Sequence, residues 1–275
     1  MNKRILLSLA TVGLLSVGAG AHAQTAAESI SPQSVPAPLQ LALQGGLKLE
    51  RKFEAAGGMT GWILSEGPGR NMVVFTSSDG EVAIAGNMLD AKGQNLTAKY
   101  LDQYAPKVDY GKFWNKLEQS AYVAEGAKGK DVKSVIYVFK DPNCSYCHLA
   151  WKAFQPYQKV GLQVRWVLVS FLGRDTENKS AALLTSKDPA ATLATLHAEF
   201  GKPSSLSTTP VSADIKAKLA ANNRLMGEMG FRGTPATLYK DKDGKVKAAD
   251  GMPRANMLPV ITGLPEQPLP ADIER

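Results

Sequence analysis

The feature that most constrains this 275-residue chain is its cysteine content, because both cysteines lie in one short stretch. The stretch reads Asn143-Cys144-Ser145-Tyr146-Cys147-His148. Four kinds of site fit two thiols at this spacing: a structural disulfide, part of a metal site, a covalent haem attachment and a redox-active dithiol. The surrounding sequence has to decide among them.

The first residues have the pattern of a bacterial secretory signal. Asn2-Lys3-Arg4 is basic, residues 5–20 are apolar and small, and Ala21-His22-Ala23 forms an A-x-A cleavage site. The apolar part is shorter than the roughly 20 residues that a helical membrane span requires. We therefore predict that residues 1–23 are a cleaved signal peptide and that the mature chain, from Gln24, is periplasmic and not inserted in the membrane. A retained N-terminal anchor is the alternative.

An oxidising compartment makes disulfides common, but a purely structural disulfide is disfavoured here. A bridge across two intervening residues closes a very small loop, and the entropy gain is only about 2 kcal/mol before strain is subtracted. A zinc site is disfavoured because the cysteines would need His148 and His197, or carboxylates, to complete four ligands. The two histidines lie far apart in the sequence, and His197 reads as one polar position on an amphipathic helix.

Haem attachment fits the local run C-x-x-C-H, and several methionines could supply a further iron ligand. These are Met226, Met229, Met252 and Met257. The context disfavours haem, because a buried β run leads directly into the motif, which a small helical cytochrome does not need. A c-type haem electron carrier therefore stays only as an alternative.

The composition is that of an ordinary globular protein, with 44% hydrophobic and 21% charged residues and a formal net charge of +7. Lysines are spread along the chain, without the basic runs and interleaved aromatic residues of nucleic-acid-binding domains. We expect no nucleic-acid partner.

The first half of the chain predicts a small antiparallel β domain. The apolar runs 59–64, 72–76 and 82–86 are separated by turn residues, and Ser78-Asp79-Gly80 indicates a hairpin. A short helix at 38–44 precedes them. Helices are predicted at 97–104, with Thr97 as N-cap, and at 113–122. A sheet of this size has exposed edges, and a second copy of the chain is one way to cover them.

From residue 134 onward, strands and helices alternate, as in an α/β domain. A buried strand at 134–139, a helix at 144–157 and a strand at 162–169 form a βαβ unit, with the cysteines at its first strand-to-helix turn. Pro156 is expected to kink or end that helix. Three helical patterns, a hairpin and a last helix follow, at 180–185, 188–200, 213–229, 236–249 and 254–261.

This placement favours the redox-active dithiol. At a helix start, unpaired N–H groups and the positive end of the helix dipole stabilise a thiolate on Cys144. Cys147 lies one turn deeper on the same face and could displace a mixed disulfide formed by Cys144. His148 either adds a positive charge or a hydrogen bond, or is an ordinary surface histidine.

The motif Gly233-Thr234-Pro235 before an apolar β run resembles the cis-proline loop of the thioredoxin fold. Together with the order of domains, it makes nearly the whole mature chain resemble the periplasmic DsbC/DsbG disulfide isomerase family, with the DsbG branch closer. The residues that carry this resemblance are Ala55-Ala56-Gly57-Gly58-Met59 with Gly61, Ala83-Ile84-Ala85-Gly86, Lys92-Gly93-Gln94-Asn95-Leu96, Tyr104-Ala105-Pro106, 135–139 with Asp141-Pro142, 144–147, 186–190 and Thr234-Pro235-Ala236.

Two residues depart from the expected pattern and leave the branch of the family open. Ser145 stands where DsbG-like motifs often have proline and DsbC-like ones glycine. Gly233 is closer to the DsbC-like loop. The second, structural cysteine pair that DsbC-like proteins tend to carry has no counterpart here.

The resemblance implies an α+β two-domain fold. It comprises a cystatin-like N-terminal dimerisation domain (24–91), a helical linker (92–128) and a thioredoxin-like catalytic domain (129–275) with a helical insertion (173–230). It also implies a thiol:disulfide interchange enzyme, an isomerase or reductase, that needs no cofactor or metal. The catalytic residues would be Cys144 and Cys147, with Ser145, Tyr146 and His148 in the motif.

The resemblance further implies that Pro235, after a cis bond, packs against the cysteines and that the backbone of Thr234 binds substrate. The partners would be a second copy of the chain, exported proteins with oxidised or sulfenylated cysteines, and the membrane electron donor DsbD. A chaperone-like binding module with a secondary redox role is the remaining alternative.

Overall fold

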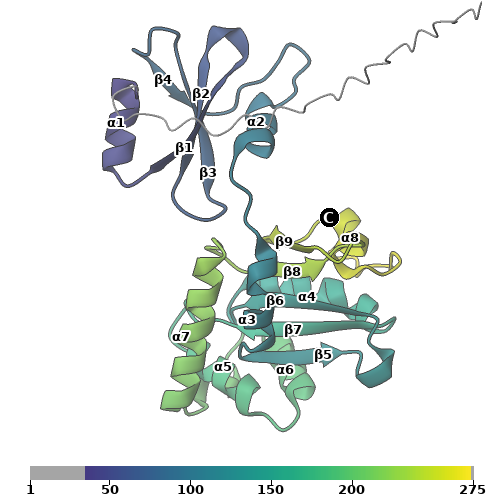
Figure 1. Ribbon diagram of the computed structural model, residues 1–275. Coiled ribbons are helices and arrows are strands. Elements are labelled where there is room, and N and C mark those ends of the chain that lie inside the picture. Colours follow the sequence, from purple (N-terminus) through teal and green to yellow (C-terminus); the bar gives the residue numbers. More distant parts are fainter. Residues whose placement is uncertain (1–34, 274–275) are drawn as a thin grey trace, which may run out of the picture. The chain divides into compact units, whose positions relative to one another are not determined.

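The computed structural model describes residues 35–273 (Figure 1). The predicted signal peptide, residues 1–23, lies outside the described residues. Within residues 35–273, no helix combines the length and apolar character that crossing a membrane requires.

The N-terminal part is a four-stranded antiparallel sheet with strand order β1-β2-β3-β4. The elements are α1 (Ala37–Gln44), β1 (Lys48–Glu54), β2 (Thr60–Ser65), β3 (Asn71–Thr76), β4 (Ala83–Ala85) and α2 (Leu96–Tyr104). Helix α2 packs on one face of this sheet, where Tyr100 and Tyr104 contact Phe53 and Phe75. The predicted strands and helices of this part are confirmed, and β1 is an additional strand.

One capping prediction for α2 is wrong. The N-cap is Asn95, whose side chain accepts a hydrogen bond from the Ala98 N–H at 3.0 Å. Thr97 is instead buried, and its hydroxyl bonds the main chain of Gly86 and Met88. Its side chain is therefore committed to the preceding loop and not to the helix start.

The second sheet has five strands in the order β5-β7-β6-β8-β9. They are β5 (Tyr122–Gly126), β6 (Ser134–Lys140), β7 (Leu162–Leu168), β8 (Ala236–Lys240) and β9 (Val246–Asp250). Strands β6 and β7 are parallel, whereas the other neighbours are antiparallel. The βαβ prediction is confirmed, with α4 (Ser145–Gln158) as the crossover helix.

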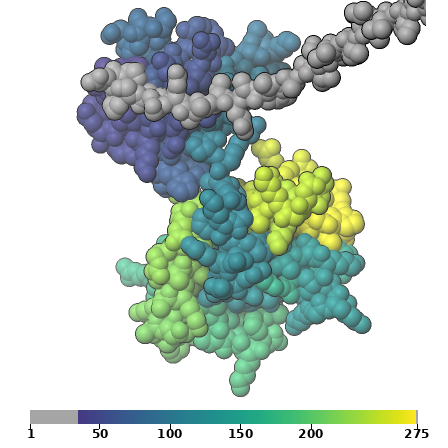
Figure 2. Space-filling view, in the orientation of Figure 1, coloured from purple at the N-terminus to yellow at the C-terminus, as the bar shows by residue number. Residues whose placement is uncertain are grey.

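Strand β6 lies in the middle of the sheet and is buried on both faces, which explains its continuous apolar run. Ile136 and Val138 point into one core, together with Phe154 of α4. Tyr137 and Phe139 point into a second core on the opposite face. The remaining helices of this unit are α3 (Trp114–Glu118), α5 (Thr176–Thr185), α6 (Pro189–Ala198), α7 (Ala213–Glu228) and α8 (Leu258–Thr262). Helix α7 forms a light-green ridge in the space-filling view (Figure 2).

One helix prediction next to this sheet needs correction. The helix expected at 113–122 ends at Glu118, and Tyr122 begins strand β5. Val123 and Glu125 are both buried on one face of β5, a two-residue period that belongs to a strand. Helix α4 ends at Gln158, two residues after Pro156.

Candidate active site

The two cysteines lie where strand β6 turns into helix α4. Asp141-Pro142-Asn143 forms the turn, and Cys144 is the N-cap residue of α4. The Cys147 N–H donates a hydrogen bond to Cys144 Sγ at 3.1 Å, so the sulfur occupies the position of a capping oxygen. The aligned N–H groups of the first turn stabilise negative charge on that sulfur.

The predicted proline loop lies beside the cysteines, although it is far away in the sequence. The Thr234–Pro235 peptide bond is cis, as the resemblance implies. The Cys144 thiol is 3.1 Å from the carbonyl oxygen of Thr234, which accepts its hydrogen bond. Pairing of β8 with β6, where Ala236 faces Phe139, brings the loop to this place.

The two sulfurs have different environments. Cys144 keeps 5% of its surface exposed, whereas Cys147 is fully buried. The hydrogen bonds from Cys147, together with the positive charge of Lys140, lower the pKa of Cys144 to about 6. Burial and the hydrogen bond to Cys144 raise the pKa of Cys147 well above its usual value. Both cysteines are free thiols in this structure.

Sequence reasoning missed Lys140, the last residue of β6. Its side chain is only 1% exposed, and its ammonium lies 5.3 Å from the centre of the Trp166 ring. Burial lowers the pKa of Lys140, and the nearby sulfurs Cys144 and Cys147 oppose this shift. A charged residue at the end of an apolar run, directly before the cysteine motif, was the available signal.

Sequence reasoning also missed Glu125, on strand β5. Its carboxylate is buried and accepts four hydrogen bonds. The indole N–H groups of Trp151 and Trp166 donate at 3.0 and 2.9 Å, and the amides of Gln155 and Gln158 donate at 3.2 and 3.0 Å. The negative charge of Glu125 also acts on Lys140. The buried anion Glu125, on β5, and the buried cation Lys140, on β6, thus lie in the same sheet, with β7 between their strands.

The prediction for His197 is wrong, because this residue is buried and only 6% exposed. Its Nδ1 atom lies 2.8 Å from Nδ1 of His148, so the fold joins two histidines that are distant in the sequence. The rings also stack on neighbours: His148 on Phe200, and His197 on Trp151. His148 is therefore half-buried in an aromatic cluster between α4 and the insertion, and burial lowers its pKa.

The turn before Cys144 is tied to the helical insertion through Asp141, which is fully buried. One carboxylate oxygen accepts hydrogen bonds from the Asn143 N–H and the Thr176 hydroxyl. The other oxygen accepts from the N–H groups of Phe171 and Leu172. Asp141 therefore fixes the position of the loop at 171–172 relative to the cysteine turn.

Exposed side chains surround this turn. Ser145 is exposed, and Tyr146, Phe171 and Leu172 are 61%, 44% and 41% exposed.

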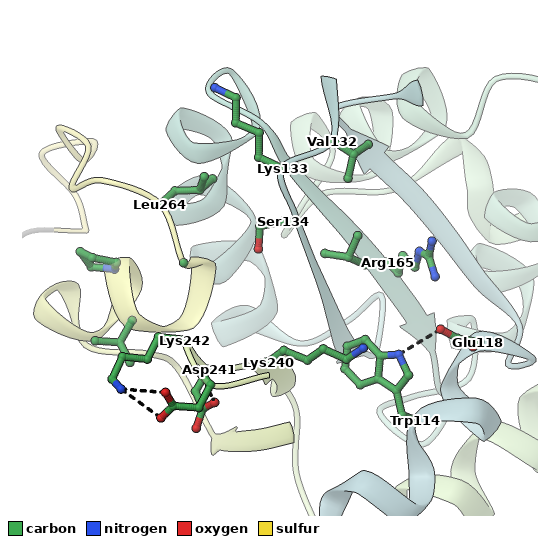
Figure 3. A pocket seen from close by; sticks show the side chains of 15 residues that line it. Trp114, Glu118, Val132, Lys133, Ser134, Arg165, Lys240, Asp241, Lys242 and Leu264 are labelled. Atoms are coloured by element: carbon green, nitrogen blue, oxygen red, sulfur yellow. Dashed lines mark hydrogen bonds and ion pairs between the residues drawn. The ribbon is translucent and has the colours of Figure 1, made fainter. Parts of the chain in front are cut away.

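A wide cavity of about 1050 Å³ opens elsewhere in this unit, around Trp114, Arg165 and Lys240 (Figure 3). Its lining does not include either cysteine or the proline loop.

The geometry bears on the alternative chemistries. A haem would need thioether bonds to both sulfurs, but Cys147 is fully buried between α4 and the sheet, where a porphyrin does not fit. Within residues 35–273, no group of three or more histidine, cysteine, aspartate or glutamate side chains is placed to hold a metal ion. One acidic thiol that keeps 5% of its surface exposed, beside one fully buried thiol, can perform thiol–disulfide exchange.

Comparison with known proteins gives the same chemistry. Residues 122–261 match the family described as "Thioredoxin-like domain". The thiol:disulfide interchange protein DsbG of Pseudomonas aeruginosa is 34% identical over 254 residues, covering 91% of this chain and 97% of the relative.

Two relatives from Escherichia coli strain K12 extend the comparison. Its DsbG is 32% identical and covers 84% of this chain and 92% of the relative. Its DsbC is 30% identical and covers 62% of this chain and 65% of the relative. From its fold and its similarity along most of its length, this chain belongs to the DsbC/DsbG family of thiol:disulfide interchange proteins, whose thioredoxin-like domain performs thiol–disulfide exchange.

Proposed function

We propose that this protein exchanges disulfides in exported proteins, with Cys144 as the attacking and Cys147 as the resolving thiol. The contrast between the two sulfurs carries the proposal. The pKa of Cys144 is lowered to about 6, whereas the pKa of Cys147 is raised well above its usual value. At pH 7 the first sulfur is mostly a thiolate, the nucleophilic form, and the second stays protonated until it is needed.

In the first step, the Cys144 thiolate attacks one sulfur of a substrate disulfide. A mixed disulfide forms, and the other substrate sulfur leaves as a thiolate that takes up a proton from water. Cys147 then loses its proton, and its sulfur attacks Cys144. The substrate thiolate leaves, and the protein retains the Cys144–Cys147 disulfide. Two electrons have passed from the dithiol to the substrate.

Two related reactions pass through the same mixed disulfide. In isomerisation, another thiolate of the substrate attacks and releases Cys144 in its reduced form. With a sulfenylated substrate, Cys144 condenses with the sulfenic acid, and hydroxide leaves. We propose that the main chain of Thr234, beside Pro235, pairs with an extended substrate segment. Ser145 and Tyr146, both exposed, would contact the substrate next to its cysteine.

We also propose where the protein acts and how it is divided. The basic, apolar and A-x-A pattern of residues 1–23 supports export to the periplasm. Residues 24–91 would be the dimerisation domain, followed by a linker. Strand β5 and the family match both begin at Tyr122, which supports placing the start of the catalytic domain there and not at residue 129.

A homodimer and the reductant DsbD are the proposed partners. Strand β4 is an edge of the N-terminal sheet, and apolar side chains on and near it are exposed. These are Val82, Ile84 and Leu89. An unpaired edge with exposed apolar residues is a surface that a second copy can cover. DsbD would restore the dithiol after reduction of a substrate.

A trapping experiment tests the catalytic assignment. In the Cys147→Ala variant the mixed disulfide cannot be resolved, so exported proteins should accumulate as complexes that reducing agent releases. The double variant Cys144→Ser/Cys147→Ala, which lacks the attacking sulfur, is the matched control. Equal recovery of complexes from both variants, or none from either, contradicts the proposal.

A chaperone-like binding module is the second candidate. The exposed Tyr146, Phe171 and Leu172 around the cysteine turn favour it, because unfolded chains bind exposed apolar side chains. The Cys144→Ser variant separates the two functions. An exchange enzyme loses reduction and isomerisation of a scrambled substrate, whereas a binding module still suppresses aggregation of an unfolded, cysteine-free protein.

A further inference from the structure

Lys140 lies beneath the active site with its side chain 1% exposed. It is the last residue of β6, opposite Leu168 of β7 and four positions before Cys144. Burying an ammonium is costly unless an opposite charge compensates it. Within the described chain, no carboxylate lies within ion-pair distance of Lys140, and its ammonium lies 5.3 Å from the centre of the Trp166 ring.

The charges that act on Lys140 come from the elements packed around it. They are the sulfurs of Cys147 and Cys144 and the carboxylates of Glu125 and Asp141. Both carboxylates are already engaged: Glu125 accepts four hydrogen bonds from side chains, and Asp141 accepts four from the surrounding turn and loop. The sulfur of Cys144, whose charge acts on Lys140, is therefore the anion that appears and disappears during the reaction.

We propose that Lys140 is a positioning residue for the reaction: its buried positive charge holds Cys144 as a thiolate and thereby keeps the resting protein in the dithiol form. This inference rests on the proposed function, in which Cys144 attacks. In the dithiol form, the Cys144 anion compensates Lys140. Oxidation removes two electrons and the Cys147 proton, and the resulting disulfide is neutral. The ammonium then loses its compensating anion, so its burial disfavours the disulfide.

A preference for the dithiol suits an isomerase, because isomerisation starts from a reduced Cys144. It also makes the protein disulfide easier for an external reductant to reduce. Lys140 additionally acts on the histidine pair, since its charge contributes to the lowered pKa of both His148 and His197. One buried charge thus influences four titratable groups, which are Cys144, Cys147 and His148 at the start of α4 and His197 on α6.

The test compares Lys140→Met, which keeps the length of the side chain and removes its charge, with Lys159→Met, a matched change at an exposed position of the same unit. Thiolate is followed by its absorbance at 240 nm as a function of pH. An electrostatic effect between nearby buried groups is on the order of tenfold in an ionisation equilibrium. We expect about tenfold less Cys144 thiolate at pH 5 in Lys140→Met and no change in Lys159→Met.

The second measurement is the equilibrium with glutathione at pH 7. Lys140→Met should shift it severalfold toward the disulfide, and Lys140→Arg, which retains the charge, should stay close to the unchanged protein. Should Lys140→Met fail to fold, Lys140→Ala replaces it, because alanine leaves no polar group unpaired. The pKa values of His148 and His197, followed by NMR, should rise when the charge is removed.

The outcomes separate this inference from the proposed function. If the wild-type protein has no acidic thiolate, this result contradicts the proposed function itself. An acidic thiolate that persists in folded Lys140→Met, with the same glutathione equilibrium, overturns the role of Lys140 and leaves the function intact. Equal effects of Lys140→Arg and Lys140→Met also overturn it, because they would reflect packing and not charge.

Discussion

His148 and His197 share one hydrogen bond, with their Nδ1 atoms 2.8 Å apart. One Nδ1 must donate and the other accept, so at least one of the two rings is neutral. Burial lowers the pKa of both residues, and the positive charges of Lys140 and Lys152 add to this effect. The contact connects α4, directly after Cys147, with α6 of the insertion.

The first prediction concerns acid stability. A histidine with a lowered folded-state pKa favours the unfolded state when it is protonated, so stability should be full above about pH 6.5 and decline as the pH falls. The urea midpoint of the reduced protein should therefore drop between pH 7.5 and pH 5.5. The His197→Phe variant should show a smaller drop. An equal drop in both proteins contradicts the coupling of these histidines to stability.

The second prediction concerns selective alkylation. With its pKa lowered to about 6, Cys144 should react with iodoacetamide at a rate that is half-maximal near pH 6. Cys147 is buried and has a raised pKa, so it should stay unmodified at pH 7. Mass spectrometry should detect one adduct on Cys144 in the reduced protein. The Cys144→Ser variant is the control, and modification of Cys147 in the folded protein contradicts the assignment.

The third prediction concerns Glu125 and its four hydrogen bonds. Glu125→Leu leaves the buried indole N–H of Trp166 and the partly buried indole N–H of Trp151 without an acceptor, which should lower the free energy of unfolding by about 3 kcal/mol. Glu125→Gln keeps one acceptor oxygen and should cost less. The matched control is Glu118→Leu, because Glu118 is exposed and accepts from one indole, that of Trp114. Equal costs for Glu118→Leu and Glu125→Leu in chemical denaturation would disprove the importance of burial here.

The fourth prediction concerns Gly61 in β2. A Cβ atom on Gly61 would lie 2.1 Å from Cζ of Phe53, whose ring is held against Tyr104 at 4.5 Å. Gly61→Ala should therefore destabilise the N-terminal sheet by about 1–3 kcal/mol. Gly86→Ala, where a Cβ atom meets open space, is the control and should cost far less. Thermal denaturation measures both, and Phe53→Leu should partly restore the Gly61→Ala variant.

The fifth prediction concerns the proposed dimer. Ile84 is 52% exposed on the edge strand β4, so Ile84→Lys should place a charge in the proposed interface and yield monomers. Ser78→Lys adds the same charge in the preceding turn and should leave the dimer intact. Light scattering coupled to size-exclusion chromatography gives the mass. If the wild-type protein is monomeric, or if the Ile84→Lys variant is dimeric, the proposed interface is wrong.

Much of the fold could be predicted because its signals are local. Residues 135–139 are apolar at every position, which indicates a strand buried on both faces, and turn residues mark the hairpins. Strand β1 was missed because Lys48–Glu54 is mostly charged and buries only Phe53 fully. Its pairing with β2 is a tertiary contact that side-chain pattern does not reveal. Strand β5 was missed because its two-residue period spans only Val123 and Glu125.

In the candidate site, too, the local features could be predicted and the long-range contacts could not. The sequence was sufficient to place both cysteines at a helix start, because strand, turn and helix follow one another there. The groups that act on the sulfurs come from elsewhere. Glu125 is on β5 and His197 is on α6, and both are polar residues that usually indicate an exposed face. Lys140 was the exception, since a charged residue inside an apolar segment next to the motif is visible in one sequence.

Asp141 anchors the loop at 171–172 without using the side chains of that loop. Its carboxylate holds the loop at 171–172 through main-chain N–H groups, which every residue except proline provides. The side chains of Phe171 and Leu172 are free to be replaced without loosening that anchor. The exposed side chains of this loop can therefore change while the position of its main chain beside the turn before Cys144 stays the same.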